Sequence, residues 1–195
     1  MIQKSKVKLL DAGLDAVRRR GLAAVSIKDI VDAAGVPKGS FHYYFASKEA
    51  YALALLDHFG RRMADVAAAI SGDPALDPVS RLRRFFDAYA ARMDEESHAT
   101  GCLLGVMAAE AGDAGPALRG RVEAGLKAFA AFLAPHIREA QAASALNSQT
   151  EPEVLAAFLV DAWEGALIRM KVEGSAKPLA DFQRVVFGSL LRPAK

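Results

Sequence analysis

Apolar residues recur at helical spacing along this 195-residue chain, and no segment alternates apolar and polar side chains as a strand does. Short stretches that contain glycine or proline interrupt the pattern and divide the chain into about nine helical segments. The first segment, residues 4–20, carries an apolar stripe at every third or fourth position, formed by Val7, Leu10, Leu14 and Val17. The pattern predicts an all-α fold.

Composition excludes several classes of protein. Hydrophobic residues make up 52% and charged residues 25% of the chain, as in globular proteins, so a disordered or collagen-like chain is excluded. A single cysteine excludes an intrachain disulfide framework, and with no signal-peptide pattern at the N-terminus it favours a cytoplasmic location. No uninterrupted apolar run approaches 18 residues, so no membrane partner is expected.

Charge is distributed unevenly. Residues 1–62 have a net charge of +5, whereas residues 63–195 have a net charge of −3. We call residues 1–62 the head and residues 63–195 the body. A basic head beside an acidic body is typical of a protein whose head binds a polyanion, although a basic surface exposed only to solvent would have the same net charge.

Residues 26–45 carry the most informative pattern. Ser26 with Asp29 three residues later predicts a capped helix, and Gly35 supplies the backbone freedom that a tight turn needs. A second short helix is expected over residues 38–44, and Ser47 is expected to cap a long helix over residues 48–70. This arrangement is a helix-turn-helix.

The ordered combination in the first 60 residues resembles the TetR family of transcriptional regulators. It is carried by Leu9-Leu10-Asp11-Ala12, Gly21, Ser26, Ile30, Ala34-Gly35-Val36, Gly39-Ser40-Phe41, Tyr44-Phe45 and Ser47-Lys48-Glu49. The resemblance implies a helix-turn-helix domain over residues 1–47 and a helical ligand-sensing and dimerisation domain over residues 48–195.

The same resemblance implies contacts with double-stranded DNA. The implied DNA-binding residues are Ser26, Lys28, Lys38, Gly39, Ser40, His42, Tyr43 and Lys48. The family usually has tyrosine at the position of His42 and histidine at that of Tyr43, so these two types are exchanged here. Phe41 and Phe45 are expected in the core of the head.

Family members bind near-palindromic operators as homodimers. The last two long helices offer two candidate seams for the dimer, with Phe158, Ala162 and Gly165 in one and Phe182 and Val186 in the other. Either seam can instead belong to the core of the monomer.

Cys102 is the first candidate sensor. Thr100 resembles an N-cap, which would place the thiol in the first turn of a helix, where the dipole favours the thiolate. The alternative is a small buried hydrophobe. The stretch 101–105, with a later Glu164-Gly165-Ala166-Leu167 before Lys171, resembles the subgroup that senses electrophiles or small unsaturated acids. Lys171 would then favour the Cys102 thiolate, or would be a solvated lysine.

Further candidates could line a ligand pocket. Tyr89, Arg92 and Trp163 are possible polar anchors and Met107 an apolar one, although such residues at helical spacing are more often core. Glu95, His98 and Cys102 have spacings of 3 and 4, but Gly101 breaks their common face, so neither a metal nor another cofactor is expected. Pro135 is expected to kink or break the seventh helix.

The sequence therefore predicts a repressor that a small molecule, or modification of Cys102, releases from its operator. One alternative is a reversible inducer with a structural Cys102. A remote alternative is a thiol-dependent enzyme. The sequence argues against it, because it contains no phosphate-binding loop, no nucleophile elbow and no paired carboxylates.

Overall fold

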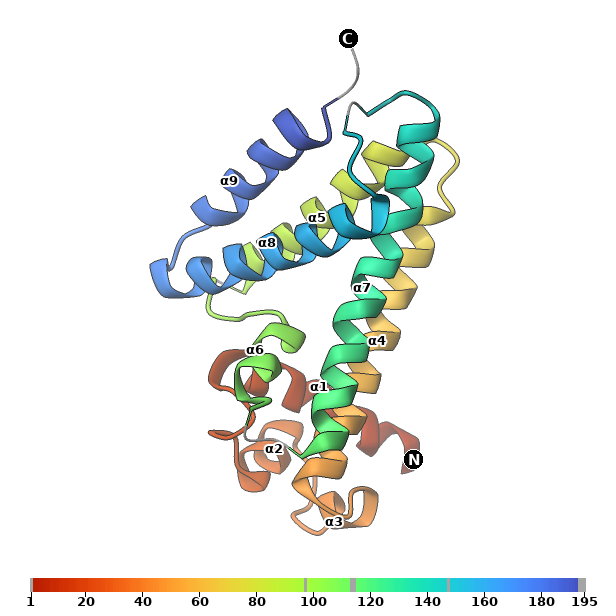
Figure 1. The fold of residues 1–195 in the computed structure, drawn as a ribbon. Coiled ribbons are helices and arrows are strands. Elements are labelled where there is room, and N and C mark those ends of the chain that lie inside the picture. Colours follow the sequence, from red (N-terminus) through yellow and green to blue (C-terminus); the bar gives the residue numbers. More distant parts are fainter. Residues whose placement is uncertain (1, 97, 113–114, 147, 193–195) are drawn as a thin grey trace. The chain divides into compact units, whose positions relative to one another are not determined.

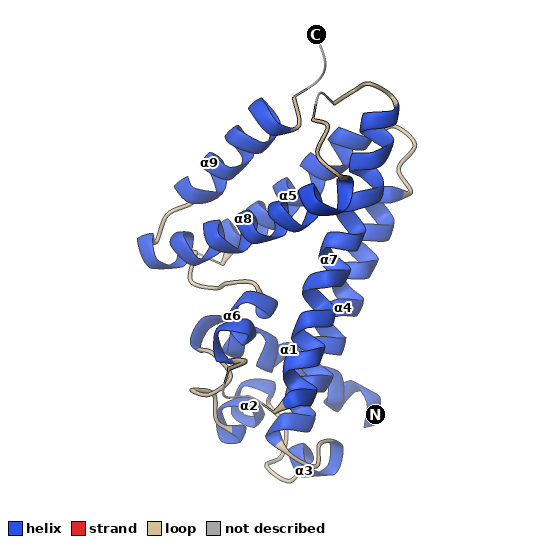
Figure 2. Cartoon of the chain, in the orientation of Figure 1, coloured by secondary structure: helices blue, strands red, loops and turns tan. Residues whose placement is uncertain are grey.

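A computed structural model of the chain describes residues 2–96, 98–112, 115–146 and 148–192, and within these ranges it contains helices and loops but no strand (Figure 2). In chain order, the elements are α1 (Ile2–Arg20), α2 (Ile27–Ala34), α3 (Ser40–Tyr44), α4 (Lys48–Ser71), α5 (Pro78–Glu95), α6 (Leu103–Glu110), α7 (Pro116–Ala142), α8 (Pro152–Glu173), α9 (Lys177–Val185) and a π-helical turn η1 (Val186–Leu190). The predicted all-α fold is confirmed.

Local capping sets the helix boundaries in the N-terminal region. The Ser26 side chain accepts a hydrogen bond from the Asp29 amide at 3.1 Å, and the Asp29 carboxylate accepts one from the Ser26 amide at 3.0 Å. Gly35 ends α2 in the left-handed region with φ +60°, where residues with a Cβ are strained. Ser47 accepts from the Ala50 amide at 3.0 Å and so begins α4. These predicted caps are confirmed.

Two local features differ from expectation. α7 continues through Pro135, so the expected break does not occur, and Leu133, Ala134 and Ile137 are buried beside it. A kink at Pro135 stays a prediction. Thr100 is not the N-cap of α6, because that position belongs to Cys102 and the helix begins at Leu103. The Thr100 hydroxyl instead accepts a hydrogen bond from Arg18.

The chain forms two compact units, which Figure 1 colours by sequence. Unit 1 comprises Met1–Arg62 and Thr100–Gly125, and unit 2 comprises Met63–Ala99 and Leu126–Lys195. α6 therefore belongs to the same unit as the helix-turn-helix, and α4 and α7 contribute to both units. The expected boundary at residue 47, between the DNA-binding domain and the ligand-sensing domain, stays a prediction.

Unit 1 has a core built from α1, α2, α3 and α4. Leu9, Leu10, Leu14 and Val17 are buried on α1, together with Phe41 and Phe45, as predicted for the two phenylalanines. The Tyr51 hydroxyl donates to the Leu9 carbonyl at 2.8 Å. Val7 was expected in the same buried stripe of α1 but is 42% exposed. Residue spacing shows which side of a helix is apolar, but not how far along the helix that side is buried.

Unit 2 has an aromatic core in which α5, α8 and α9 meet. Ring centroids lie 4.9 Å apart for Phe86 and Trp163, 4.9 Å apart for Phe86 and Phe182, and 5.0 Å apart for Trp163 and Phe182. Tilted and edge-on rings at these separations stabilise a core beyond their buried area. Figure 1 shows α9 following α8 and turning back beside it.

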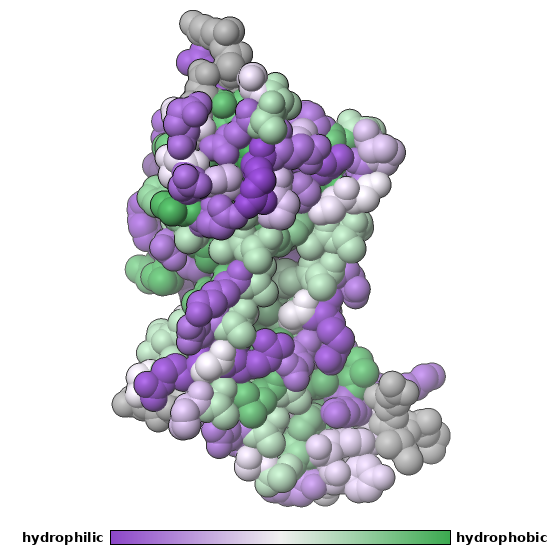
Figure 3. Space-filling model, turned by 45° about the vertical axis from the view of Figure 1, so that its right-hand side comes forward, coloured by the Kyte–Doolittle hydropathy of each residue, from purple (hydrophilic) through white to green (hydrophobic). Residues whose placement is uncertain are grey.

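On the face drawn in Figure 3, hydrophilic and apolar residues are interspersed. Among the described helices, none combines the length and the apolar character needed to cross a membrane.

Candidate functional site

The predicted recognition helix is α3, which a small aromatic core supports from behind. Phe41 is fully buried, and its ring centroid lies 5.4 Å from that of Phe45 and 5.2 Å from that of Tyr51. Because Phe41 anchors one side of this five-residue helix, its other side chains are held in a fixed orientation toward solvent. A short helix that is exposed and held in place from behind can enter the major groove of DNA.

The predicted base-reading residues lie on that exposed side. Lys38, Gly39 and His42 are exposed, Ser40 is half-buried, and Tyr43 is 71% exposed. The Tyr43 ring contacts Tyr44 edge-on, with 4.9 Å between the ring centroids. The structure therefore places these five residues together on one solvent-facing surface.

The predicted phosphate contacts flank this surface but already have protein partners. Lys28 Nζ lies 2.7 Å from Asp32 Oδ2, and this hydrogen bond raises the pKa of Lys28. Lys48 is half-buried and donates to the Ala23 carbonyl at 3.3 Å. Ser26 uses its hydroxyl to cap α2. Both lysines are held by partners within the protein, and their contact with phosphate stays a prediction.

The candidate sensing residues divide between the two units. Cys102 and Met107 belong to unit 1, whereas Tyr89, Arg92, Trp163 and Lys171 belong to unit 2. Cys102 is 3% exposed at the N-cap of α6, and Met107 is buried one turn later in the same helix. The expected pairing of Cys102 with Lys171 would join the two units and stays a prediction.

Tyr89 and Trp163 are brought together in unit 2, with ring centroids 5.5 Å apart and nearly perpendicular planes. Trp163 is fully buried, and its Nε1–H has no hydrogen-bond acceptor among the described residues. Leaving a buried donor unpaired costs about 1–3 kcal/mol, so this group is a candidate anchor for a ligand oxygen. Arg92 forms an ion pair with Glu96, in which Arg92 Nε lies 3.1 Å from Glu96 Oε1.

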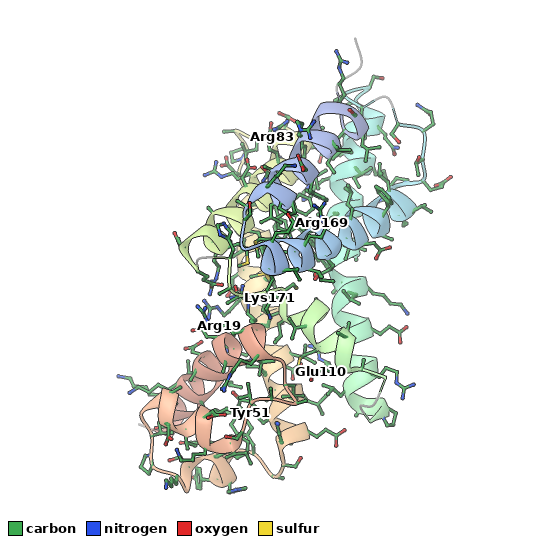
Figure 4. The ribbon with its side chains drawn as sticks, turned by 90° about the vertical axis from the view of Figure 1, so that its left-hand side faces the viewer. Arg19, Tyr51, Arg83, Glu110, Arg169 and Lys171 are labelled. Atoms are coloured by element: carbon green, nitrogen blue, oxygen red, sulfur yellow. The ribbon has the colours of Figure 1, made fainter. Side chains whose placement is uncertain are left out.

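Lys171 lies near the end of α8, where Figure 4 labels it together with Arg169. It is half-buried, and desolvation lowers the pKa of its ammonium group below the ordinary value. Both expectations for Lys171, a partner of Cys102 or a solvated lysine, stay predictions. Glu173, the nearest carboxylate that follows in sequence, binds Arg169 at 2.6 Å.

Two residues around α6 were not predicted. Arg18 is 2% exposed, and its guanidinium donates to the Gly101 carbonyl at 2.8 Å and to the Thr100 hydroxyl at 3.1 Å. Glu110, at the other end of α6, accepts from the Ala23 amide at 3.1 Å. Both partners are more than 80 residues away in sequence, so no local spacing indicates them.

The two predicted dimer seams have different environments. On α8, Phe158 is 51% exposed, Gly165 is exposed and Ala162 is half-buried. Phe182 and Val186 are buried within unit 2, where the Phe182 ring packs at a steep angle against the rings of Phe86 and Trp163. The second seam is therefore monomer core, because the aromatic cluster already covers it.

Comparison with known proteins agrees with this arrangement. Residues 9–55 match the family model "Bacterial regulatory proteins, tetR family", and residues 78–186 match "Tetracyclin repressor-like, C-terminal domain". The chain is 33% identical to the HTH-type transcriptional repressor DhaR from Mycobacterium sp. (strain GP1) over 186 residues, which cover 94% of this chain and 90% of that protein.

Two solved structures extend the likeness to the fold. The regulatory protein TetR from Rhodobacter sphaeroides superposes with a TM-score of 0.88 at 33% identity, covering 92% of this chain and 95% of that one. The reduced form of E. coli NemR superposes with a TM-score of 0.79 at 26% identity, covering 98% and 100%.

The family match covers both the helix-turn-helix with its exposed α3 and the helical C-terminal region. Regulators of this kind bind DNA and are not enzymes. The chain belongs to the TetR family and is a DNA-binding transcriptional repressor.

Proposed function

We propose that this repressor binds a near-palindromic operator as a homodimer and is released by a small molecule or by modification of Cys102. The observation that carries the proposal is the surface of α3, where His42 and Tyr43 are exposed on a helix anchored by Phe41, and where Lys38 is exposed just before the helix begins. Such a surface reads only a few base pairs, so selective binding requires a second copy. A bacterial repressor of this type acts in the cytoplasm, where its operator DNA lies.

An apolar stripe on α8 supports the dimer. Its apolar members Val154, Phe158, Ile168 and Val172 are exposed, and the exposed residues Asp161 and Gly165 lie between them, so that neighbours in the series are three or four residues apart. This spacing keeps the residues on one side of a helix, and the exposed apolar side chains are left uncovered by the rest of the chain. A C2 dimer would bury the same stripe from both copies and hold two recognition helices about 34 Å apart.

Covalent release would begin at the N-terminus of α6. A thiolate at Cys102 would add to an electron-poor alkene, forming a carbon–sulfur bond as the carbon–carbon π bond breaks, while the neighbouring carbon takes a proton from water. Because Cys102 is buried, the reaction would proceed through a locally opened state, and the adduct would prevent α6 from returning to its packing. The similar NemR structure is that of a reduced form, which favours thiol chemistry here by analogy.

A reversible inducer is the second candidate, and Trp163 favours it. A ligand with a carbonyl or carboxylate oxygen would satisfy the buried Nε1–H, and the rings of Phe86, Tyr89 and Phe182 would surround its apolar part. Cys102 would then be a structural residue of unit 1.

The test measures binding to fluorescein-labelled DNA from upstream of the protein's own gene by anisotropy. Wild type, Cys102→Ser and Trp163→Phe are each compared without additive, with N-ethylmaleimide and with acrylate. Mass spectrometry of the treated protein counts the adducts on each variant. One adduct per chain with release of wild type, but not of Cys102→Ser, establishes the covalent route.

Release of Cys102→Ser by acrylate, together with loss of that release in Trp163→Phe, establishes the reversible route. DNA binding that neither compound changes in any variant contradicts release through either site. Catalytic turnover of N-ethylmaleimide, rather than a single adduct, would contradict a regulator that reacts once.

A further inference from the structure

We infer that Lys6, on α1, is a further DNA-binding residue, which is held on the ring of Phe45 and binds a phosphate beside the groove that α3 enters. The inference rests on the proposed function, because it assumes that α3 reads DNA. The DNA-binding residues implied by the family resemblance all lie outside α1. Lys6 and Phe45 both belong to unit 1.

The contact between Lys6 and Phe45 carries the inference. Lys6 is exposed, and its Nζ lies over the Phe45 ring, 5.7 Å from the centroid. An ammonium group within about 6 Å of a ring is attracted by the negative face of that ring. Phe45 is the C-cap of α3 and directly follows Tyr44, the last residue of that helix. The contact therefore holds a positive charge at the C-terminal end of the predicted recognition helix.

The Phe45 ring is fixed in turn by the core of unit 1. It is 4% exposed, and its centroid lies 5.4 Å from that of Phe41 and 4.9 Å from that of Tyr51, which Figure 4 labels. The Tyr51 hydroxyl donates to the Leu9 carbonyl of α1 at 2.8 Å. A Cβ at Gly13 would collide with this hydroxyl, so the close approach of the two helices requires a glycine there. These contacts fix α1 in one register beside α3.

The position of Lys6 on α1 explains how its charge reaches this end of α3. Leu9 and Leu10, three and four residues later, are buried, so Lys6 lies at the edge of the side of α1 that packs on the core. A lysine at such an edge lays its aliphatic stem along the apolar surface and keeps its ammonium group in water. Lys8 is also exposed, but two residues along a helix it points in nearly the opposite direction.

Charge balance distinguishes Lys6 from the cations around α2. Lys28 Nζ lies 2.7 Å from Asp32 Oδ2, and Arg20 Nη2 lies 3.3 Å from Asp29 Oδ2, so each of these cations is next to a carboxylate. Among the residues that the structure describes, none places a carboxylate within ion-pair distance of Lys6. A phosphate that approaches Lys6 therefore does not have to displace a carboxylate first.

The size of α3 brings Lys6 close to the DNA backbone. The major groove is about 12 Å wide and is bordered by phosphates on both sides. α3 has five residues and is therefore about 7.5 Å long, so both of its ends come near those phosphates. Lys38 is exposed just before the helix begins, and Lys6 lies at the other end. Two cations at opposite ends would fix how α3 lies in the groove without reading the bases themselves.

The test measures the salt dependence of DNA binding. Kd is determined by anisotropy for the full chain at several NaCl concentrations, on DNA from upstream of its own gene and on a scrambled duplex of the same composition. Each phosphate contact contributes about −0.9 to the slope of log affinity against log salt concentration. Lys6→Gln should reduce the size of this slope by about 0.9 for each bound copy of the chain, or about 1.8 for a dimer. Lys6→Arg should restore the wild-type slope.

Matched variants separate a contact from a change in net charge. Lys8→Gln removes the same charge from the other side of α1 and should leave the slope at the wild-type value. Phe45→Leu keeps the charge of Lys6 but removes the ring, so DNA affinity should fall, and Lys6→Gln should weaken binding less in that background than in wild type. The lysine variants change exposed side chains only, so they test the inference even if Phe45→Leu fails to fold.

Equal slopes for wild type and Lys6→Gln would overturn the inference. Equal reductions in Lys6→Gln and Lys8→Gln would also overturn it, because they would show an effect of net charge alone. Failure of the proposed function gives a different result, since wild type would then bind the scrambled duplex as tightly as the upstream DNA. Selective binding by wild type with an unchanged slope in Lys6→Gln would remove the role of Lys6 and leave the repressor in place.

Discussion

Gly21 shows at the scale of one residue how backbone conformation and packing act together. Its φ of +86° costs a residue with a Cβ about 1–2 kcal/mol, and a Cβ there would also displace the Glu110 carboxylate. We expect Gly21→Ala to lower the free energy of unfolding by at least about 1 kcal/mol, as measured by urea denaturation.

Gly60 is the matched control, because it lies in α4 with a helical backbone and nothing within 4 Å of an added Cβ. Gly60→Ala should leave stability unchanged or raise it by up to about 1 kcal/mol, since alanine favours a helix over glycine. Equal destabilisation by both substitutions would contradict the role given to Gly21.

Residues also show what a sequence can and cannot predict. The Ser26–Asp29 capping box was predicted correctly because both partners lie within one turn. The Arg18 contact with Gly101 could not be predicted, because 83 residues separate the partners and only the folded chain brings them together. The shift of the N-cap from Thr100 to Cys102 follows from the same contact, which occupies the Thr100 hydroxyl.

At the scale of the helix, α8 has a buried side and an exposed side. Trp163 and Leu167 face the core of unit 2, whereas Phe158 and Ile168 are exposed. We expect Phe158→Glu to convert the dimer into a monomer, because the charge would be buried without a partner at the interface. Analytical ultracentrifugation measures the change in mass, and DNA affinity should fall with it.

Val66→Glu is the control for that substitution, because Val66 is exposed on α4, away from the stripe in sequence. It should leave the oligomeric state unchanged. A dimer that persists in Phe158→Glu would show that the α8 stripe is not the interface.

The helices also set a limit on prediction from pattern. Periodicity located the apolar faces of α8 and α9 but not what covers them, so Phe182 and Phe158 looked equivalent until the aromatic cluster showed that Phe182 is already buried. For α7 the propensity of Pro135 was outweighed by tertiary packing of its neighbours. The all-α class and the caps of α2 and α4 were predictable because they depend on short-range spacing.

For the molecule as a whole, we expect His136 to make the free energy of unfolding depend on pH. It is buried in unit 2, its Nε2 lies 3.0 Å from the Ser71 hydroxyl, and burial first, then Arg81, lowers the pKa of the imidazole below 6.5, against a smaller opposing effect of Glu139. Below pH 6.5 the unfolded chain binds a proton that the folded chain resists. The free energy of unfolding should therefore fall as the pH drops below 6.5 toward the lowered value.

Urea denaturation at several pH values between about 7.5 and about 5 measures this dependence. His136→Gln should show a flatter dependence than wild type, because glutamine does not titrate. If the free energy of unfolding changed with pH equally in both proteins, another group would control the loss of stability at low pH.

Footprinting of the protein on DNA from upstream of its own gene tests the central claim most directly, because it reports both recognition helices at once. The account predicts a protected near-palindrome whose half-sites lie about one helical turn apart, with protection lost in Tyr43→Ala and in Phe158→Glu. A single unpaired half-site, or no protected sequence at all, would contradict a dimeric repressor that reads DNA through α3.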